Sequence, residues 1–191
     1  CDVAFWDIYY EHCSYFTKGS LARLFRRAGF AVRDLWTAYD DQYLMIEAYP
    51  AGEPGSKGAG EQALAGEESP AETLDMVHYF VEHYTARREQ WRSALADWRA
   101  RGKRVVLWGG GSKGVAFLTT LQQSRDDIAY AVDINPIKHG TFMAGTGQEI
   151  ISPESLKIYR PDVVIIMNPV YRDEVTADLT ALGLSPQIET L

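Results

Sequence analysis

Cysteine is scarce in this sequence, which contains only Cys1 and Cys13 among its 191 residues and no Cys-x-x-Cys pair. A disulfide framework and a cysteine-built metal site are therefore not expected, and we predict no metal-binding residues. The sequence also lacks an apolar run close to the ~20 residues that span a membrane, and it does not begin with a signal-peptide pattern. These absences favour a soluble protein of the reducing cytoplasm that does not contact membranes.

Positive charge is in short supply as well, with 19 lysines and arginines against 26 acidic residues and a formal net charge of -7 at pH 7. Without a basic stripe to neutralise phosphates, we expect no nucleic-acid partner. Apolar residues are plentiful at 46%, enough for one large domain or for one domain and part of another. Any anionic ligand must be held by a few local groups.

A composition shift divides the chain. Residues 51–69 are rich in glycine, alanine and glutamate and have no apolar period, which is typical of a flexible connector. We therefore treat residues 1–50 and 70–191 as separate parts.

The first part contains a predicted helix and hairpin. Thr17 is predicted to be the N-cap of the helix, and Gly29 is predicted to terminate it. The apolar face of this helix is predicted to consist of Leu21, Leu24 and Phe25. Segments 30–37 and 41–49 are rich in β-branched and aromatic residues and predict two antiparallel strands joined by a turn. A helix and a hairpin alone leave apolar side chains uncovered, so this part is interpreted as the C-terminal piece of a larger domain.

The second part is predicted to open with a long helix. Ser69 and Glu72 have the spacing of a capping box, with Pro70 at the first helical position and Gly102 beyond the end. Apolar residues at helical spacing predict packing along one side, namely Leu74, Val77, Val81, Tyr84, Trp91, Leu95 and Trp98.

After this helix, strands and helices alternate, which predicts an α/β fold with a parallel sheet. The five strands are predicted at 104–108, 128–133, 148–151, 162–167 and 187–191, and helical segments at 113–123, 153–156 and 172–182. With right-handed crossovers the expected strand order is 3-2-1-4-5. The order reverses between the first and fourth strands, so a ligand crevice is expected where the segments 109–114 and 167–171 meet.

The segment 109–114, "GGGSKG", predicts a phosphate site. Gly109, Gly111 and Gly114 match the G-x-G-x-x-G spacing directly after a strand, and the following helix presents unpaired N–H groups to an anion. Ser112 and Lys113 add a hydroxyl and an ammonium at the helix entry. The spacing alone is a weak signal, because the glycines can also serve only to pack the helix onto the sheet.

Asp133 ends the second strand about 20 residues further on, where dinucleotide-binding domains carry a ribose-binding acid. NAD binding therefore stays open as an interpretation. Asn135, Lys138 and His139 follow in a polar loop that either approaches a sugar or phosphate or is an ordinary solvated loop. Hydride transfer from NAD would also need a domain that binds the accepting substrate. The predicted sheet extends to residue 191 and leaves no segment for such a domain, which counts against NAD.

The segment "FWDIYYEHCSYFT" concentrates aromatic residues with a glutamate and a histidine before the first helix. His12 beside Glu11 suits a general base, and Tyr9 or Tyr10 suits a hydrogen-bond donor to a developing oxyanion. The alternative is an aromatic patch that contacts another part of the protein.

Several ordered blocks of the chain resemble the S-adenosylmethionine-dependent sugar C-methyltransferases. These enzymes join a zinc-binding N-terminal domain, a methyltransferase domain and a Rossmann-like C-terminal domain. The similar blocks are "YYEHCSYFTKGSLARLFRRAGFAV", "GGGSKG", "YAVDINPIKHG", "GT", "ISPESL" and "RPDVVIIMNPVY". The resemblance implies that residues 1–50 belong to a class I methyltransferase domain and that 70–191 form the Rossmann-like domain.

The resemblance also implies a reaction, methylation of a carbon next to the ketone of a nucleotide-linked keto-deoxysugar. Catalytic roles then fall on His12, Glu11 and Tyr9. The residues expected to bind the nucleotide-diphosphate sugar are Gly109, Gly111, Ser112, Lys113, Gly114, Asp133, Asn135, Lys138, Asn168 and Tyr171.

Three departures from the family pattern bear on these expectations. The glycine-rich methyl-donor motif and the zinc cysteines are missing, so S-adenosylmethionine and zinc are expected in upstream domains and this chain should not methylate alone. Where many relatives carry His-Gly-Gly-Ser, residues 40–43 read Asp-Asp-Gln-Tyr, which leaves the sugar open. An NAD(P)-binding or non-catalytic Rossmann-like module is the alternative function, and the oligomeric state stays open.

Overall fold

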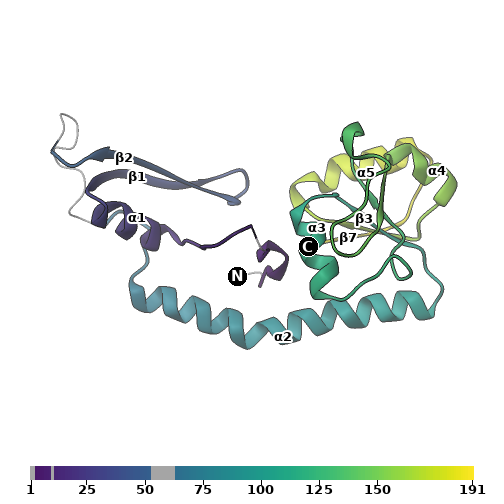
Figure 1. The fold of residues 1–191 in the computed structure, drawn as a ribbon, viewed down its shortest axis with the longest axis horizontal. Coiled ribbons are helices and arrows are strands. Elements are labelled where there is room, and N and C mark those ends of the chain that lie inside the picture. Colours follow the sequence, from purple (N-terminus) through teal and green to yellow (C-terminus); the bar gives the residue numbers. More distant parts are fainter. Residues whose placement is uncertain (1–2, 10, 53–62) are drawn as a thin grey trace. The chain divides into compact units, whose positions relative to one another are not determined.

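The computed structural model describes residues 3–9, 11–52 and 63–191 (Figure 1). The chain divides into two compact units, one formed by His12–Glu82 and the other by Cys1–Glu11 together with His83–Leu191. Within the predicted linker 51–69, residues 53–62 lie outside the described residues. The predicted domain boundaries therefore stay a prediction.

The unit His12–Glu82 contains helix α1 (Lys18–Arg27) and the antiparallel strands β1 (Phe30–Ala38) and β2 (Tyr43–Pro50). The predicted helix start is confirmed, because the Thr17 side chain accepts a hydrogen bond from the Ser20 amide in a capping box. A turn with three left-handed residues, Tyr39, Asp40 and Asp41, joins the strands.

The core of this unit shows where the predicted helix face is wrong. Ala22, Val32 and Leu35 are buried, and Leu21 and Phe25 pack against them. Leu24 is 47% exposed. At 100° per residue the buried face is centred between residues 21, 22 and 25, so the side chain of Leu24 points outside it.

Two consecutive glutamates hold α1 to the segment that precedes the long helix. The Glu67 carboxylate forms a two-point ion pair with the Arg26 guanidinium, with distances of 2.7 and 2.6 Å. The Glu68 carboxylate accepts a hydrogen bond from the Gly19 amide at 2.8 Å, at the positive end of α1. Long-range polar contacts therefore stabilise a unit with a small apolar core.

Helix α2 (Pro70–Ala100) begins with the predicted capping box. The Ser69 amide donates to the Glu72 carboxylate at 2.7 Å, and the Glu72 amide donates to the Ser69 hydroxyl at 3.2 Å. The predicted apolar stripe is only half correct. Three of its later members are buried, Trp91, Leu95 and Trp98, whereas three earlier ones are exposed, Leu74, Val77 and Val81. Apolar spacing defines a helix face, but burial also requires a core beside it, and the three exposed members lie in the part of α2 that belongs to the unit His12–Glu82, whose apolar core is small.

The sheet consists of five parallel strands in the order β5-β4-β3-β6-β7, which confirms the predicted order. These strands are β3 (Val105–Trp108), β4 (Tyr130–Val132), β5 (Glu149–Ile151), β6 (Val163–Ile166) and β7 (Gln187–Thr190). The helices of this unit are α3 (Ser112–Thr120), α4 (Leu156–Tyr159) and α5 (Arg172–Ala181), with 3-10 turns η1 (Phe5–Asp7), η2 (Pro136–Lys138), η3 (Pro153–Ser155) and η4 (Pro169–Tyr171).

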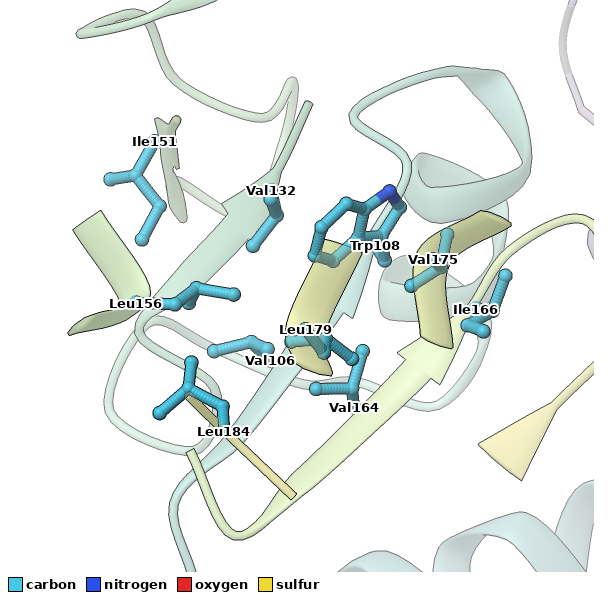
Figure 2. Close-up of a cluster of buried hydrophobic side chains, with 10 residues drawn as sticks. All are labelled: Val106, Trp108, Val132, Ile151, Leu156, Val164, Ile166, Val175, Leu179 and Leu184. Atoms are coloured by element: carbon cyan, nitrogen blue, oxygen red, sulfur yellow. The ribbon is translucent and has the colours of Figure 1, made fainter. Parts of the chain in front are cut away.

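A buried apolar cluster covers one face of the sheet. Figure 2 shows side chains of β3 and β6 facing those of α5, and the cluster consists of Val106, Trp108, Val132, Ile151, Leu156, Val164, Ile166, Val175, Leu179 and Leu184. Leu107 and Ile165 alternate with these residues and are also fully buried, so the opposite face is covered as well. The sheet is therefore a middle layer between helices, as an α/β fold requires.

The 3-10 turn η1 packs against α3, although more than one hundred residues separate them in the chain. The Phe5 ring is 1% exposed and stacks on the Phe117 ring, with centroids 6.3 Å apart. Trp6 is buried beside it, and the Arg87 guanidinium lies 5.5 Å from the Trp6 ring centroid. Aromatic burial thus attaches the segment before Tyr9 to the sheet unit.

Two features are absent from the described residues. No helix in them has the length and apolar character needed to cross a membrane. No group of three histidine, cysteine, aspartate or glutamate residues in the described ranges could hold a metal ion. Cys13 is an exposed free thiol, and Cys1 lies outside the described residues.

The Arg26–Glu67 pair yields a stability prediction. Glu67→Gln should lower the free energy of unfolding by about 2 kcal/mol, the range for a hydrogen bond to a charged group, because the Glu67 side chain is 4% exposed. Arg26 holds the pKa of Glu67 below its ordinary value of 4.5. This stabilisation is complete above pH 4.5 and is lost as the pH falls through the lowered pKa.

Urea unfolding of the wild type and of Glu67→Gln between pH 3 and pH 7 measures both effects. Glu47→Gln is the matched control, because the Arg33–Glu47 pair is exposed on both sides. A loss in Glu67→Gln no larger than in Glu47→Gln would contradict the assigned role.

Candidate ligand-binding site

The turn between β3 and α3 requires glycine at its first position. Gly109 has φ of +124°, a conformation that residues with a side chain rarely adopt. Its N–H donates to the Val132 carbonyl at 2.7 Å, and a Cβ built on it would lie 3.0 Å from the Cβ of Met167. Gly109 therefore allows three strand ends to meet closely.

Packing requires glycine at position 114 and leaves little room for a side chain at position 110. A Cβ on Gly114 would lie 2.8 Å from the Gly109 carbonyl oxygen, which brings the first turn of α3 against the loop. A Cβ on Gly110 would lie 3.2 Å from the Asp133 Oδ2. Two predicted ligand glycines, Gly109 and Gly114, thus have structural reasons of their own.

Gly111 differs from the other three glycines. Among the described residues, a Cβ there would have no atom within 4 Å beyond its chain neighbours, and its φ of -115° is accessible to any residue. Gly111 is the N-cap of α3 and supplies no side-chain hydrogen bond to the first turn. The fold does not require glycine here, so the open space in front of α3 is where an anion can approach the helix dipole. Ser112 is exposed at the same helix end.

Asp133 braces the glycine turn. One carboxylate oxygen accepts from the Gly110 amide at 3.1 Å and from the Lys138 ammonium at 2.7 Å. The other accepts from the Asn135 amide at 2.9 Å. The Lys138 ammonium also donates to the Gly110 carbonyl at 3.3 Å. The carboxylate and the ammonium together hold Gly110 from both sides.

The electrostatics of Asp133 agree with a structural role. Burial alone raises the pKa of this carboxyl, but hydrogen bonds from Lys138 and from the Asn135 and Gly110 amides outweigh burial and the pKa lies below its ordinary value. Asp133 is therefore ionised at neutral pH and already accepts three hydrogen bonds. A ribose hydroxyl would have to compete for this carboxylate, which disfavours the NAD interpretation.

The two predicted asparagines each cap a 3-10 turn. The Asn135 side chain accepts from the Ile137 amide at 3.1 Å at the start of η2, and the Asn168 side chain accepts from the Val170 amide at 3.1 Å at the start of η4. These Asx turns explain the two Asn-Pro pairs in the sequence.

A cavity of about 240 Å³ lies at the carboxyl ends of β3, β4 and β6. Trp108, Val132 and Ile166 form its apolar floor, while Asn168 and Tyr171 of the η4 turn contribute to its rim. Gly109 and Asp133 line it too, so the structure brings together the two segments that the strand order predicted to meet.

The cavity is acidic. Among the described residues, those lining it include Asp133, Glu174 and Asp178 but no lysine or arginine. Sequence reasoning missed Glu174 and Asp178, although their spacing of four on a helix puts both on one face. Carboxylates accept hydrogen bonds from hydroxyl and N–H groups and repel phosphates. The cavity therefore suits an uncharged part of a ligand, and the anionic part fits better at Gly111.

A second cavity, of about 280 Å³, lies at the amino ends of β3 and β4 and contains none of the predicted site residues. Three of its cations have acidic partners, because Arg99 pairs with Asp127 and both Lys103 and Arg104 pair with Asp162. The paired charges and the position at the opposite edge of the sheet make it the weaker candidate.

Lys113 lies one residue into α3 and has a partner that the sequence did not reveal. Its ammonium is 3.3 Å from the Asp7 carboxylate of η1, and the two side chains are 27% and 42% exposed. Asp7 and Lys113 are 106 positions apart in the numbering, and no local pattern connects them.

The predicted catalytic residues fall in both units. Tyr9 is partly buried and Glu11 is exposed in the sheet unit, whereas His12 is exposed in the unit His12–Glu82. The His12 and Tyr15 rings lie 5.8 Å apart, edge to face. The catalytic roles of Tyr9, Glu11 and His12 stay predictions.

Comparison with known proteins identifies relatives of the chain. The model of the family described as "C-methyltransferase C-terminal domain" matches residues 52–184. C-methyltransferase NovU of Streptomyces niveus is 29% identical over 171 residues, which are 88% of this chain and 41% of NovU. The chain thus spans less than half the length of this relative.

Similarity to solved structures is weak. RSP, a Rex-family repressor, has a TM-score of 0.36 and 14% identity and covers 59% of this chain and 60% of its own. RSP in complex with beta-NAD+ and operator DNA has a TM-score of 0.35 and 16% identity, covering 59% and 58%. Scores this low support no functional conclusion.

The contrast between Gly111 and Gly114 yields a prediction. Gly111→Val should change the free energy of unfolding by less than about 1 kcal/mol, because its side chain enters open space. It should nevertheless abolish binding of a nucleotide-diphosphate sugar. Gly114→Ala should destabilise the fold by about 1 to 3 kcal/mol, because its Cβ meets the Gly109 carbonyl.

Thermal unfolding and calorimetric titration of both variants check this pair. If Gly111→Val is folded and binds with wild-type affinity, the glycine turn serves packing alone.

Proposed function

The chain belongs to the C-methyltransferase C-terminal domain family, and on this premise we propose that it is the substrate-binding portion of an S-adenosylmethionine-dependent C-methyltransferase. The proposed substrate is a nucleotide-linked keto-deoxysugar that is methylated on a carbon next to its ketone. Because the chain corresponds to 41% of NovU, we assign the complete reaction to a longer protein.

The open amino end of α3 carries the proposal. Gly111 is the one glycine of the turn that neither clashes nor needs a left-handed backbone, so a ligand that approaches the backbone is the best reason for its lack of a side chain. The amides of the first turn, the helix dipole and the Lys113 ammonium make this end suitable for a diphosphate.

The acidic cavity supports the proposal that two regions of the site bind two different parts of the ligand. Its floor beside Trp108 is apolar, and its rim carries Glu174 and Asp178. A sugar or nucleobase matches this lining, because its faces are weakly polar and its edges donate hydrogen bonds. Gly109 lines the cavity and is two residues from Gly111, so one ligand can contact both regions.

The proposed chemistry assigns proton transfer to the segment after η1. A proton next to a ketone is acidic only when the enolate is stabilised. We propose that His12 accepts this proton, since histidine exchanges protons near neutral pH, that Glu11 orients it, and that Tyr9 donates a hydrogen bond to the enolate oxygen.

S-adenosylmethionine would supply an electrophilic methyl group to the resulting carbon nucleophile. No residue of this chain is assigned to it. Within the described residues the glycine turn at 109–111 already suits a diphosphate, and the acid that follows, Asp133, braces the turn instead of facing a ribose.

Calorimetric titration with dTDP-glucose and with NAD tests the proposed function. We expect binding of dTDP-glucose, and NAD at least about tenfold weaker because Asp133 is engaged. Lys113→Ala should weaken dTDP-glucose binding by about 1 to 3 kcal/mol and reduce its salt dependence.

Lys157→Ala, an exposed lysine of α4, is the matched control and should bind normally. Tighter binding of NAD than of dTDP-glucose would favour the alternative of an NAD(P)-binding module.

The base is tested in a longer protein that also carries a methyl-donor-binding domain. In D₂O, with a keto sugar and an unreactive analogue of the methyl donor, the wild type should exchange deuterium into the carbon next to the ketone. His12→Ala should slow this exchange about 10²- to 10⁴-fold, the contribution of a positioned general base, and Tyr9→Phe should slow it less.

His78→Ala, an exposed histidine of α2, should exchange at the wild-type rate. Exchange in His12→Ala as fast as in the wild type would remove His12 from the role of base.

A further inference from the structure

The Asp7–Lys113 ion pair joins the two regions to which the proposed function assigns binding and catalysis. Lys113 lies two residues after Gly111, at the amino end of α3. Asp7 ends η1, and Tyr9 follows it by two residues. Two residues of extended chain span at most about 7 Å, so the ion pair lies close to the segment with the proposed oxyanion donor.

The ion pair is not what holds η1 in place. Phe5 is buried against Phe117, and its ring also meets the Tyr84 ring edge to face at 6.2 Å. These aromatic contacts stabilise η1 whether or not Asp7 is charged. Asp7 therefore contributes mainly charge at the mouth of the proposed diphosphate site.

A diphosphate at Gly111 would meet this charge. The other ammonium near the turn, that of Lys138, already contacts Asp133 and the Gly110 carbonyl. Lys113 is then the cation best positioned to neutralise the ligand, and its ammonium already contacts an anion 3.3 Å away. Two anions beside one partly exposed ammonium repel each other.

We infer that Asp7 is a positioning residue that competes with the diphosphate for Lys113. When the diphosphate binds, it replaces the Asp7 carboxylate at the Lys113 ammonium. Asp7, which precedes Tyr9 by two residues, is then released from α3. The inference rests on the proposed function, since the diphosphate belongs to the proposed substrate. By linkage, the exchange couples occupancy of the binding site to the contact between Asp7 and α3.

The test is a double-mutant cycle on the 191-residue chain, titrated with inorganic pyrophosphate and with dTDP-glucose. Asp7→Asn keeps the size of the side chain and removes its charge. It should bind both ligands about two- to fivefold more tightly than the wild type, the range for a partly exposed ion pair. In the Lys113→Ala background the same substitution should produce no gain.

Asp126→Asn is the matched control, because it removes one exposed negative charge at the opposite edge of the sheet and should leave both affinities unchanged. A gain equal to that of Asp7→Asn would mean that net charge, not competition at Lys113, is responsible. Circular dichroism and thermal unfolding verify that each variant is folded.

The two ligands separate failure of the inference from failure of the proposed function. If both bind and Asp7→Asn shows no gain, or the gain persists without Lys113, the inference is wrong and the proposed function stands. If pyrophosphate shows the gain and dTDP-glucose does not bind, the exchange at Lys113 stands and the proposed substrate is wrong. If neither ligand binds the wild type, both are wrong.

Discussion

The Asp133 carboxylate is the interaction on which the ligand-binding edge depends. Asp133 directly follows β4, and its carboxylate accepts from the Gly110 amide of the glycine turn and pairs with Lys138 of η2. Two segments that are separate in the chain, the glycine turn and residues 133–138, are thereby held together. With the turn fixed from this side, Gly111 faces open space and the amino end of α3 stays accessible. A buried carboxylate that looks like a ribose ligand in the sequence is a structural brace.

The site beside Asp133 has two regions, which favour ligand groups of different charge. The end of α3 with Lys113 suits an anion, whereas the neighbouring cavity, with Glu174 and Asp178 on its rim, suits hydrogen-bond donors without negative charge. A nucleotide-diphosphate sugar combines both chemistries in one molecule. Membership of a C-methyltransferase family gives this combination its biochemical context.

Local signals in the sequence predicted the elements that depend on neighbouring residues. The capping residues Thr17 and Ser69 and the glycine turn follow from patterns within a few positions. The strand order follows from the alternation of strands and helices together with the right-handed crossover rule. Features that depend on distant contacts could not be predicted. Leu74 continues a helical stripe yet is exposed, because stripe spacing does not say how far a core extends. Asp7 meets Lys113 only because the aromatic side chains of η1 pack on α3.

The central claim is that the amino end of α3 holds the diphosphate of a nucleotide sugar. The most direct measurement is the change in amide chemical shifts of the ¹⁵N-labelled chain on addition of dTDP-glucose. The account predicts the largest changes at the amides of Gly111, Ser112 and Lys113, with smaller ones at residues lining the adjoining cavity. Saturable binding that leaves these three amides unchanged and shifts others instead would contradict it.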